Sequence, residues 1–152
     1  MILSTLCYIE KDDQYLMLHR TKKSNDMNKD KWLGIGGKFE DRESPEECII
    51  REVKEETGLT LKTYKLRSIV TYVSTTWETE YMYVFTANEF EGELQPCNEG
   101  DLQWIDKSQV TNLNMWEGDK IFLENIQEHD SFFTLKLEYD GEKLVNHNLK
   151  KY

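Results

Sequence analysis

Basic residues and prolines are scarce in this chain. It has 19 Lys and Arg residues against 29 Asp and Glu residues, which gives a formal net charge of −10 at pH 7. Proteins that bind polymeric nucleic acid usually present a basic surface to its phosphates. The composition therefore argues against polymeric nucleic acid as a partner. The only prolines are Pro45 and Pro96.

Cysteines and long apolar runs are also few. Cys7, Cys48 and Cys97 are an odd number without the spacing of a metal site, so we expect three reduced thiols. No segment approaches the ~18 apolar residues of a membrane span, and the first residues lack the basic region of a signal peptide. We expect a soluble, cytoplasmic protein that has no membrane partner.

The 152 residues suit a single domain over 1–152, because a chain of this length buries about two thirds of its unfolded surface. No linker or internal repeat divides it. Residues rich in β-formers predict strands over 2–10, 15–19, 66–73, 80–87 and 103–105, and a closing hairpin over 133–149 turns at Asp140-Gly141. A polar loop is expected from Thr21 to Lys31. Trp116 to Gln127 has the apolar spacing of an amphipathic helix.

Another helix is predicted from Pro45 to Thr57. Ser44 is a favourable N-cap, Pro45 fits the first helical position, and Glu47 completes a capping box with Ser44. Gly58 suits the left-handed residue that ends a helix. With two helices and several strands, we expect helices on both faces of a sheet.

The two sides of that first helix differ in character. At 100° per residue, Ile49, Ile50 and Val53 share one arc, whereas Glu52, Glu55 and Glu56 share another. Carboxylates at these spacings repel one another, and a hard cation such as Mg²⁺ or Mn²⁺ would offset the repulsion. The alternative is a solvated helix face. Glycines at 34, 36, 37 and 58 and charged neighbours around the acidic side favour the metal-binding interpretation.

Residues 37–59, GKFEDRESPEECIIREVKEETGL, resemble the Nudix box. The pattern GX5EX7REUXEEXGU, with U aliphatic, is matched at every defined position. The resemblance implies an α/β/α sandwich with a mixed β-sheet between helices, and an enzyme that hydrolyses a nucleoside diphosphate linked to another group.

The same resemblance assigns roles by position. Glu52, Glu55 and Glu56 correspond to the metal-binding and water-activating carboxylates; Glu56 is our candidate for a direct ligand and Glu52 for a ligand or the general base. Arg51 would orient Glu52 and pair with Glu43. The carbonyl of Gly36, in the turn before the box, would add a backbone metal ligand. Glu99 would supply a further acidic ligand, or else is a surface residue of an acidic loop. Such chemistry needs cations, because a diphosphate repels an attacking hydroxide.

Residues outside the box resemble the branch that hydrolyses oxidised purine nucleoside triphosphates. By position, Trp116 would stack on the purine and Asp119 would hydrogen-bond its edge. A structural role is the alternative for each: Trp116 as an anchor at the helix N-terminus and Asp119 as a dipole partner. We also expect Lys23 and Lys38 to steer phosphates, and Tyr72 and Met27 either to line the pocket or to pack structurally. Two positions depart from the human-type branch, which has Asn where this chain has Leu33 and Asp where it has Gly118.

The leading hypothesis is therefore a Mg²⁺-dependent diphosphatase that converts 8-oxo-dGTP to the monophosphate and pyrophosphate. Hydrolysis of plain dNTPs or dinucleoside polyphosphates stays open. ADP-ribose hydrolases tend to carry a proline some way after the box, and this chain has none there. A non-catalytic nucleotide sensor is the competing class, although such a module would be expected to have lost box glutamates. The sequence leaves the choice between a monomer and a homodimer open.

Overall fold

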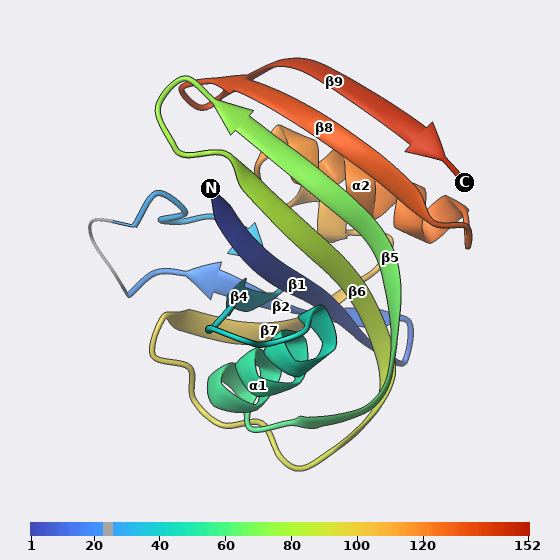
Figure 1. Ribbon diagram of the computed structural model, residues 1–152. Helices are drawn as coiled ribbons and strands as arrows, with labels where there is room; N and C mark the ends of the chain where they lie inside the picture. The colour runs from blue at the N-terminus through green and yellow to red at the C-terminus, as the bar shows by residue number, and fades with distance from the viewer. Residues whose placement is uncertain (23–25) are drawn as a thin grey trace.

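The computed structural model describes residues 1–22 and 26–152, and a mixed β-sheet runs through it (Figure 1). The helices are α1 (Pro45–Thr57), α2 (Glu117–Glu128) and the short 3₁₀ helix η1 (Val110–Asn112). The strands are β1 (Ile2–Lys11), β2 (Gln14–Arg20), β3 (Trp32–Leu33), β4 (Ile35–Lys38), β5 (Thr60–Ser74), β6 (Glu80–Glu91), β7 (Gly100–Asp106), β8 (Phe133–Asp140) and β9 (Lys143–Lys151).

The strands pair in the order β3-β2-β1-β6-β5-β8-β9, and β4 pairs with β1 while β7 pairs with β2. Two pairs, β1 with β6 and β5 with β8, are parallel, and the others are antiparallel. The β1–β2 hairpin turns at Asp12 and Asp13, whose φ values of 51° and 62° match the positive φ at both central residues of a type I′ turn. The closing hairpin is confirmed as β8 and β9.

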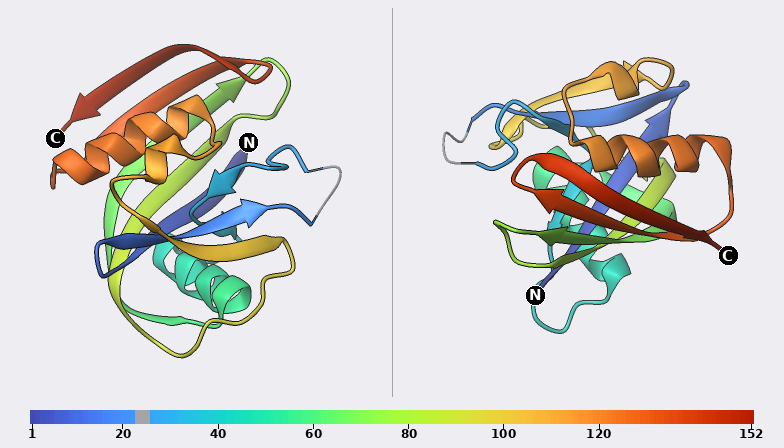
Figure 2. Two further views of the ribbon diagram at one scale, coloured as in Figure 1. Left: turned by 180° about the vertical axis from the view of Figure 1, so that it is seen from behind. Right: turned by 90° about the horizontal axis from the view of Figure 1, so that it is seen from above.

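Helices cover both faces of the sheet, which confirms the expected α/β/α arrangement. Helix α1 packs Ile49 and Val53 against β1, β2 and β6, and α2 packs Phe122 and Leu123 on the opposite face. Figure 2 shows α2 on one side of the sheet and α1 on the other. Within the described residues, neither helix has the length and apolar character that a membrane crossing needs.

Three parts of the sheet differ from the sequence prediction. Strand β5 begins at Thr60 rather than at residue 66 and reaches Ser74 with register shifts against β6. Its first half is mostly polar, so hydrophobic patterning gave no strand signal, and pairing with β6 decides its conformation. The short strands β3 and β4 and the helix η1 were also missed, because segments of two to four residues carry no period to detect.

Candidate active site

The first predicted helix forms as its sequence signals indicate. The Ser44 side chain accepts from the Glu47 N–H, the Glu47 side chain accepts from the Ser44 N–H, and Pro45 opens the helix. Gly58 ends it with φ of 81°. Burial of Ile49 and Val53 fixes the rotation of α1 on the sheet. As a result, Glu52, Glu55 and Glu56, which we call the acidic ridge, face away from the core and toward a cleft.

Strand β4 lies beside the acidic ridge and contains Gly36 and Gly37. Gly36 does not lie in a turn, as the sequence suggested, but pairs with Leu6 inside β4, because β1 offers an unpaired edge there. Its N–H donates to Glu56 Oε2 at 3.2 Å. A Cβ added to Gly37 would lie 2.5 Å from Cδ of Glu52. The missing side chains therefore let the ridge approach the backbone of β4.

Arg51 holds the ridge and the preceding loop together. Its Nε and Nη2 donate to the two carboxylate oxygens of Glu43 at 2.7 and 2.9 Å, the pair expected from the sequence. Its Nη1 donates to Glu52 at 2.8 Å and to Glu55 at 3.2 Å. Hydrogen bonds from Arg51 lower the pKa of Glu43 to about 2. Arg51, which itself lines the cleft, therefore orients two ridge carboxylates.

The opposite end of the ridge is electrostatically crowded. Burial raises the pKa of Glu56, and contact with the Glu99 carboxyl raises it further. Burial also raises the pKa of Glu52. Glu99 lies where the loop after Cys97 enters β7, and its Oε2 is 3.3 Å from Nη1 of Arg20. The structure thus brings Glu99 to the ridge from far along the chain.

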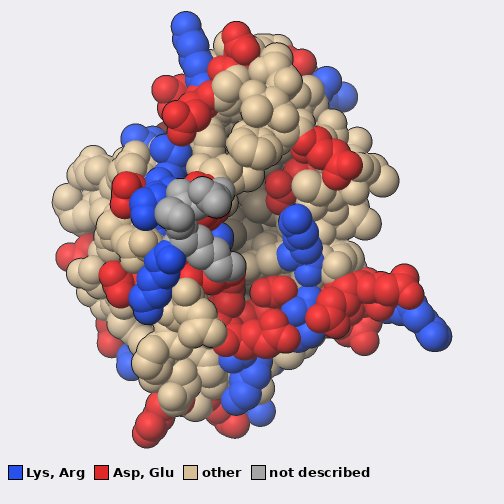
Figure 3. Space-filling model, turned by 90° about the vertical axis from the view of Figure 1, so that its left-hand side faces the viewer, with Lys and Arg blue, Asp and Glu red and all other residues tan. Residues whose placement is uncertain are grey.

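One large cleft joins the acidic ridge to the N-terminal end of α2. It encloses about 910 Å³, within the usual size range of ligand pockets. Figure 3 shows this hollow with a band of acidic side chains along its lower border. Glu52, Glu55, Glu56 and Glu99 line it at one end, and Tyr72, Trp116 and Asp119 line it at the other.

Asp119 is buried at the wall of the cleft, in the first turn of α2. It accepts a hydrogen bond from the hydroxyl of Tyr72, which lies on β5. Burial raises the pKa of Asp119 to about 7, and Tyr72 and Lys31 act in the opposite direction. Near neutral pH, this carboxyl can therefore either donate or accept a hydrogen bond. Tyr72 lines the cleft as well as packing in the core.

Trp116 is the N-cap of α2 rather than its first helical residue, so the helix begins one residue later than predicted. Its Nε1 donates to Asn28 Oδ1 at 2.7 Å, and its ring stands edge-on to Tyr139. Lys31 Nζ lies 4.9 Å from the ring centroid. These contacts fix the indole at the cleft, where its exposed part is only 8%.

The other residues proposed for substrate binding fall around the same opening. Met27, Leu33 and Lys38 all line the cleft, and Met27 is exposed. Lys23 lies outside the described residues.

Sequence reasoning missed several residues that complete the cleft. Arg20 and Asn28 hold Glu99 and Trp116, respectively. Ser4 and Glu80 form a hydrogen bond on the sheet floor. Both stand at inward-facing strand positions whose neighbours two residues on, Leu6 and Met82, are buried. A polar residue among the inward-facing apolar residues of a strand indicates a candidate site residue, and the alternation of polar and apolar residues along the strand reveals it.

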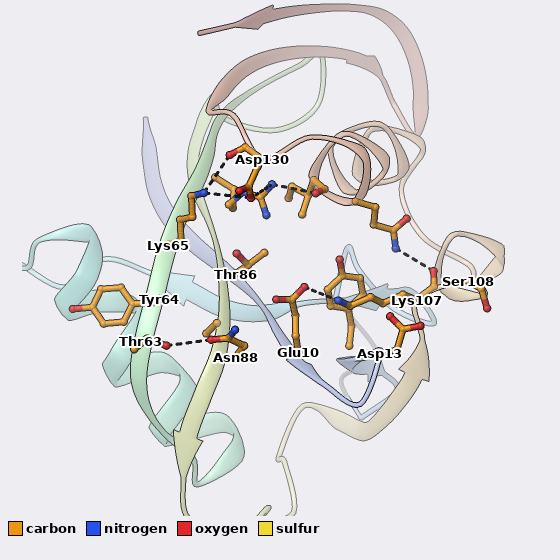
Figure 4. Close-up of a pocket in the computed structure, with 15 residues that line it drawn as sticks. Glu10, Asp13, Thr63, Tyr64, Lys65, Thr86, Asn88, Lys107, Ser108 and Asp130 are labelled. Atoms are coloured by element: carbon orange, nitrogen blue, oxygen red, sulfur yellow. Dashed lines mark hydrogen bonds and ion pairs between the residues drawn. The ribbon is translucent and has the colours of Figure 1, made fainter.

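A second cavity lies at the C-terminal end of α2 (Figure 4). Its cations already have partners: Lys107 pairs with Glu10 at 2.8 Å and Lys65 with Asp130 at 3.3 Å. Arg67 donates to the carbonyls of Ile126 and His129, which ends α2. This cavity therefore has a structural explanation and lacks the carboxylate arrangement of the cleft.

The donor set of the cleft fits a hard divalent cation, which takes oxygen ligands. In the described part of the chain, no group of three or more His, Cys, Asp or Glu side chains is already arranged closely enough to hold a metal ion. Arg51 draws Glu52 and Glu55 together, while Glu56 and Glu99 crowd each other. A cation would relieve that crowding, since it favours the ionised carboxylates.

Comparison with known proteins gives consistent relatives. The NUDIX domain model matches residues 2–126. The chain is 31% identical over 125 residues to an uncharacterized Nudix hydrolase of Bacillus subtilis, covering 79% of this chain and 75% of that protein. It is 31% identical over 123 residues to the oxidized purine nucleoside triphosphate hydrolase of Danio rerio, covering 78% and 77%.

The fold agrees with a solved structure. The crystal structure of a MutT protein from Bacillus halodurans superposes with a TM-score of 0.88 at 30% identity, covering 98% of this chain and 97% of that one. The family generally uses divalent metal ions and acts on small-molecule nucleotides. From the domain match and these relatives, the chain is a member of the Nudix hydrolase family, of the MutT-like pyrophosphohydrolase type.

Proposed function

We propose that this protein hydrolyses an oxidised purine nucleoside triphosphate, 8-oxo-dGTP in the first instance, to the monophosphate and pyrophosphate, with Mg²⁺ as the cofactor and Mn²⁺ as a substitute. The observation that carries the proposal is the shared cleft. The acidic ridge lies at one end and Trp116, Asp119 and Tyr72 lie at the other. The name of the zebrafish relative supports the choice of base.

The nucleoside end would be bound by the aromatic and acidic residues near α2. Trp116 offers an indole held by Asn28 and Tyr139, and stacking on a base contributes about 1–3 kcal/mol. Asp119 is positioned by Tyr72 to bond the edge of the base. Leu33 adds an apolar wall where a polar contact would otherwise be possible.

The phosphate end would be bound at the acidic ridge. The carbonyl of Gly36 and the carboxylates of Glu52, Glu55, Glu56 and Glu99 would hold the cation. When bound, the cation supplies positive charge to the phosphate oxygens and acidifies a coordinated water. Arg51 orients Glu52 and Glu55 through hydrogen bonds, and Lys38 at the rim would attract the phosphates.

In the reaction, a water oxygen bonds to a phosphorus of the α–β anhydride and the bridging P–O bond breaks. The proton of that water passes to a ridge carboxylate, for which Glu52 is our candidate. Burial raises the pKa of Glu52, which strengthens it as a base. The products are the nucleoside monophosphate and pyrophosphate.

A substrate screen tests the proposal. Steady-state kcat/KM would be measured with Mg²⁺ for 8-oxo-dGTP, dGTP, ADP-ribose and diadenosine polyphosphates. We expect 8-oxo-dGTP to give the highest value. A higher value for ADP-ribose or a dinucleoside polyphosphate would refute the proposed substrate class, and nucleotide binding by calorimetry without turnover would favour a sensor.

The variant Glu56→Gln tests the role of the ridge. The Glu56 carboxylate would help to hold the cation that stabilises the charge of the transition state. Removing the negative charge of Glu56 should therefore lower kcat by at least about 100-fold. Glu46→Gln is a matched control: it makes the same change on the exposed first turn of the same helix. A Glu56→Gln enzyme with the rate of the control would remove Glu56 from the metal site.

A further inference from the structure

Glu80 is an acidic residue of the cleft that lies outside the acidic ridge. It opens β6 and lines the cleft. In the antiparallel β5–β6 pair it lies directly across from Tyr72. Directly opposed residues of an antiparallel pair point to the same face. Glu80 and Tyr72 therefore stand side by side on the cleft floor.

The position of Glu80 is unusual for a carboxylate. The next inward-facing residues of β6, Met82 and Val84, are buried in the core cluster under α2. A partly buried charge needs a partner, and the Ser4 hydroxyl donates to Glu80 Oε2 at 2.5 Å. Ser4 is itself only 4% exposed. One carboxylate oxygen is thus held from the floor of the sheet.

Glu80 and Asp119 flank Tyr72 as two acids of one pocket. The Tyr72 hydroxyl donates to Asp119, which comes from α2, while Glu80 comes from the sheet. The charge of Glu80 contributes to the raised pKa of Asp119, so the two carboxyls are electrostatically coupled. At the nucleoside end, the cleft therefore presents acceptors from two directions.

We propose that Glu80 is a base-reading residue that accepts a hydrogen bond from a purine N–H and thereby favours 8-oxoguanine over guanine. This inference rests on the proposed function. Guanine has a lone pair at N7, whereas 8-oxoguanine carries a hydrogen there. A carboxylate accepts from an N–H and repels a lone pair. With Asp119 as the second acid, the pocket suits a base that presents N–H donors on both of its edges.

The test is a comparison of base preference in Glu80→Gln. A Gln amide can donate as well as accept, so it tolerates the N7 lone pair. We expect the ratio of kcat/KM for 8-oxo-dGTP to that for dGTP to fall by about 10- to 100-fold, the range of a hydrogen bond to a charged group. The change should lie mainly in KM, because Glu80 contacts the base rather than the phosphates.

Two further variants serve as controls. Glu89→Gln makes the same change on the same strand at an exposed residue outside the cleft, and it should leave the ratio unchanged. Ser4→Ala removes the donor that positions Glu80, so the ratio should fall in the same direction by a smaller factor. Circular dichroism and thermal melting would verify folding, and Ser4→Ala keeps the inference testable if Glu80→Gln does not fold.

The outcomes separate this inference from the proposed function. If the wild type prefers a different nucleotide, the 8-oxo-dGTP proposal fails, and the four common dNTPs are then used to rank bases. A changed ranking in Glu80→Gln would still assign base reading to Glu80. Equal scaling of every substrate, or a ratio identical to that of Glu89→Gln, would overturn the inference and leave Glu80 with a structural role only.

Discussion

The buried carboxyl of Asp119 gives the protein a pH-dependent stability that one substitution should remove. Its pKa is raised from the ordinary 3.8 to about 7, with burial as the largest cause. In Asp119→Asn, the side chain has nearly the same shape and is neutral at every pH. Its amide oxygen can still accept from the Tyr72 hydroxyl. The variant therefore removes the titration while keeping the contact.

The sign follows from the two protonation states. The stability contributed by protonated Asp119 is fully present below the unfolded pKa and is lost as pH rises through about 7. Between pH 5 and 8.5, linkage with these two pKa values gives a loss of about 2–3 kcal/mol in wild type relative to Asp119→Asn. The variant should therefore gain relative stability toward alkaline pH.

Urea unfolding at pH 5, 6, 7 and 8.5 would measure this difference for both proteins. The difference between wild type and variant cancels groups that titrate alike in both, so it isolates Asp119. With a urea m-value of about 1–3 kcal/mol per molar, the midpoints should diverge by about 1 M or more. A difference that stays constant across this pH range would refute the assignment of a raised pKa to Asp119.

Three further predictions concern the cleft. Arg51→Lys cannot make the paired bonds to Glu43 while holding Glu52, so kcat should fall at least about 10-fold with little change in the KM measured for the nucleotide. Gly37→Ala places a Cβ 2.5 Å from Cδ of Glu52, which is the flexible end of that side chain. The Glu52 carboxylate should therefore be displaced, so turnover should fall by a similar factor, while the urea unfolding free energy should change by less than about 1 kcal/mol. Trp116, which lines the cleft and would stack on the purine, should dominate the fluorescence change on nucleotide binding, and a Trp116→Phe protein that keeps the full change would contradict this.

The sequence was most informative where local signals agree with one another. Around α1, the cap at Ser44, the stop at Gly58 and the apolar spacing all specify one helix in one rotation. The acidic ridge follows from that rotation, because 3.6 residues per turn place its three members on one side. The pair between Arg51 and Glu43 is also local, eight residues apart. These features need no knowledge of the rest of the chain.

The nucleoside end of the cleft could be predicted only in part, because long-range pairing assembles it. Asp119 reaches Tyr72 across 47 positions, and Glu80 reaches Ser4 across 76. Neither contact follows from a local pattern. The extent of β5 also depends on tertiary context. Its first half is mostly polar and is a strand because it pairs with β6. Sequence could indicate Asp119, but not that a second acid would face the same pocket.

There is a physical reason why the acidic ridge could be predicted from sequence and the nucleoside end of the cleft only in part. Holding a cation requires several oxygens on one rigid surface, and a single capped helix can carry most of them at fixed spacing. Discriminating a base requires donors and acceptors from different directions around a planar ring, which no single element can provide. Here β6, β5 and α2 each contribute one polar group, Glu80, Tyr72 and Asp119. Changes of substrate preference among chains with the same box should therefore arise at such inward-facing strand positions, while the ridge stays unchanged.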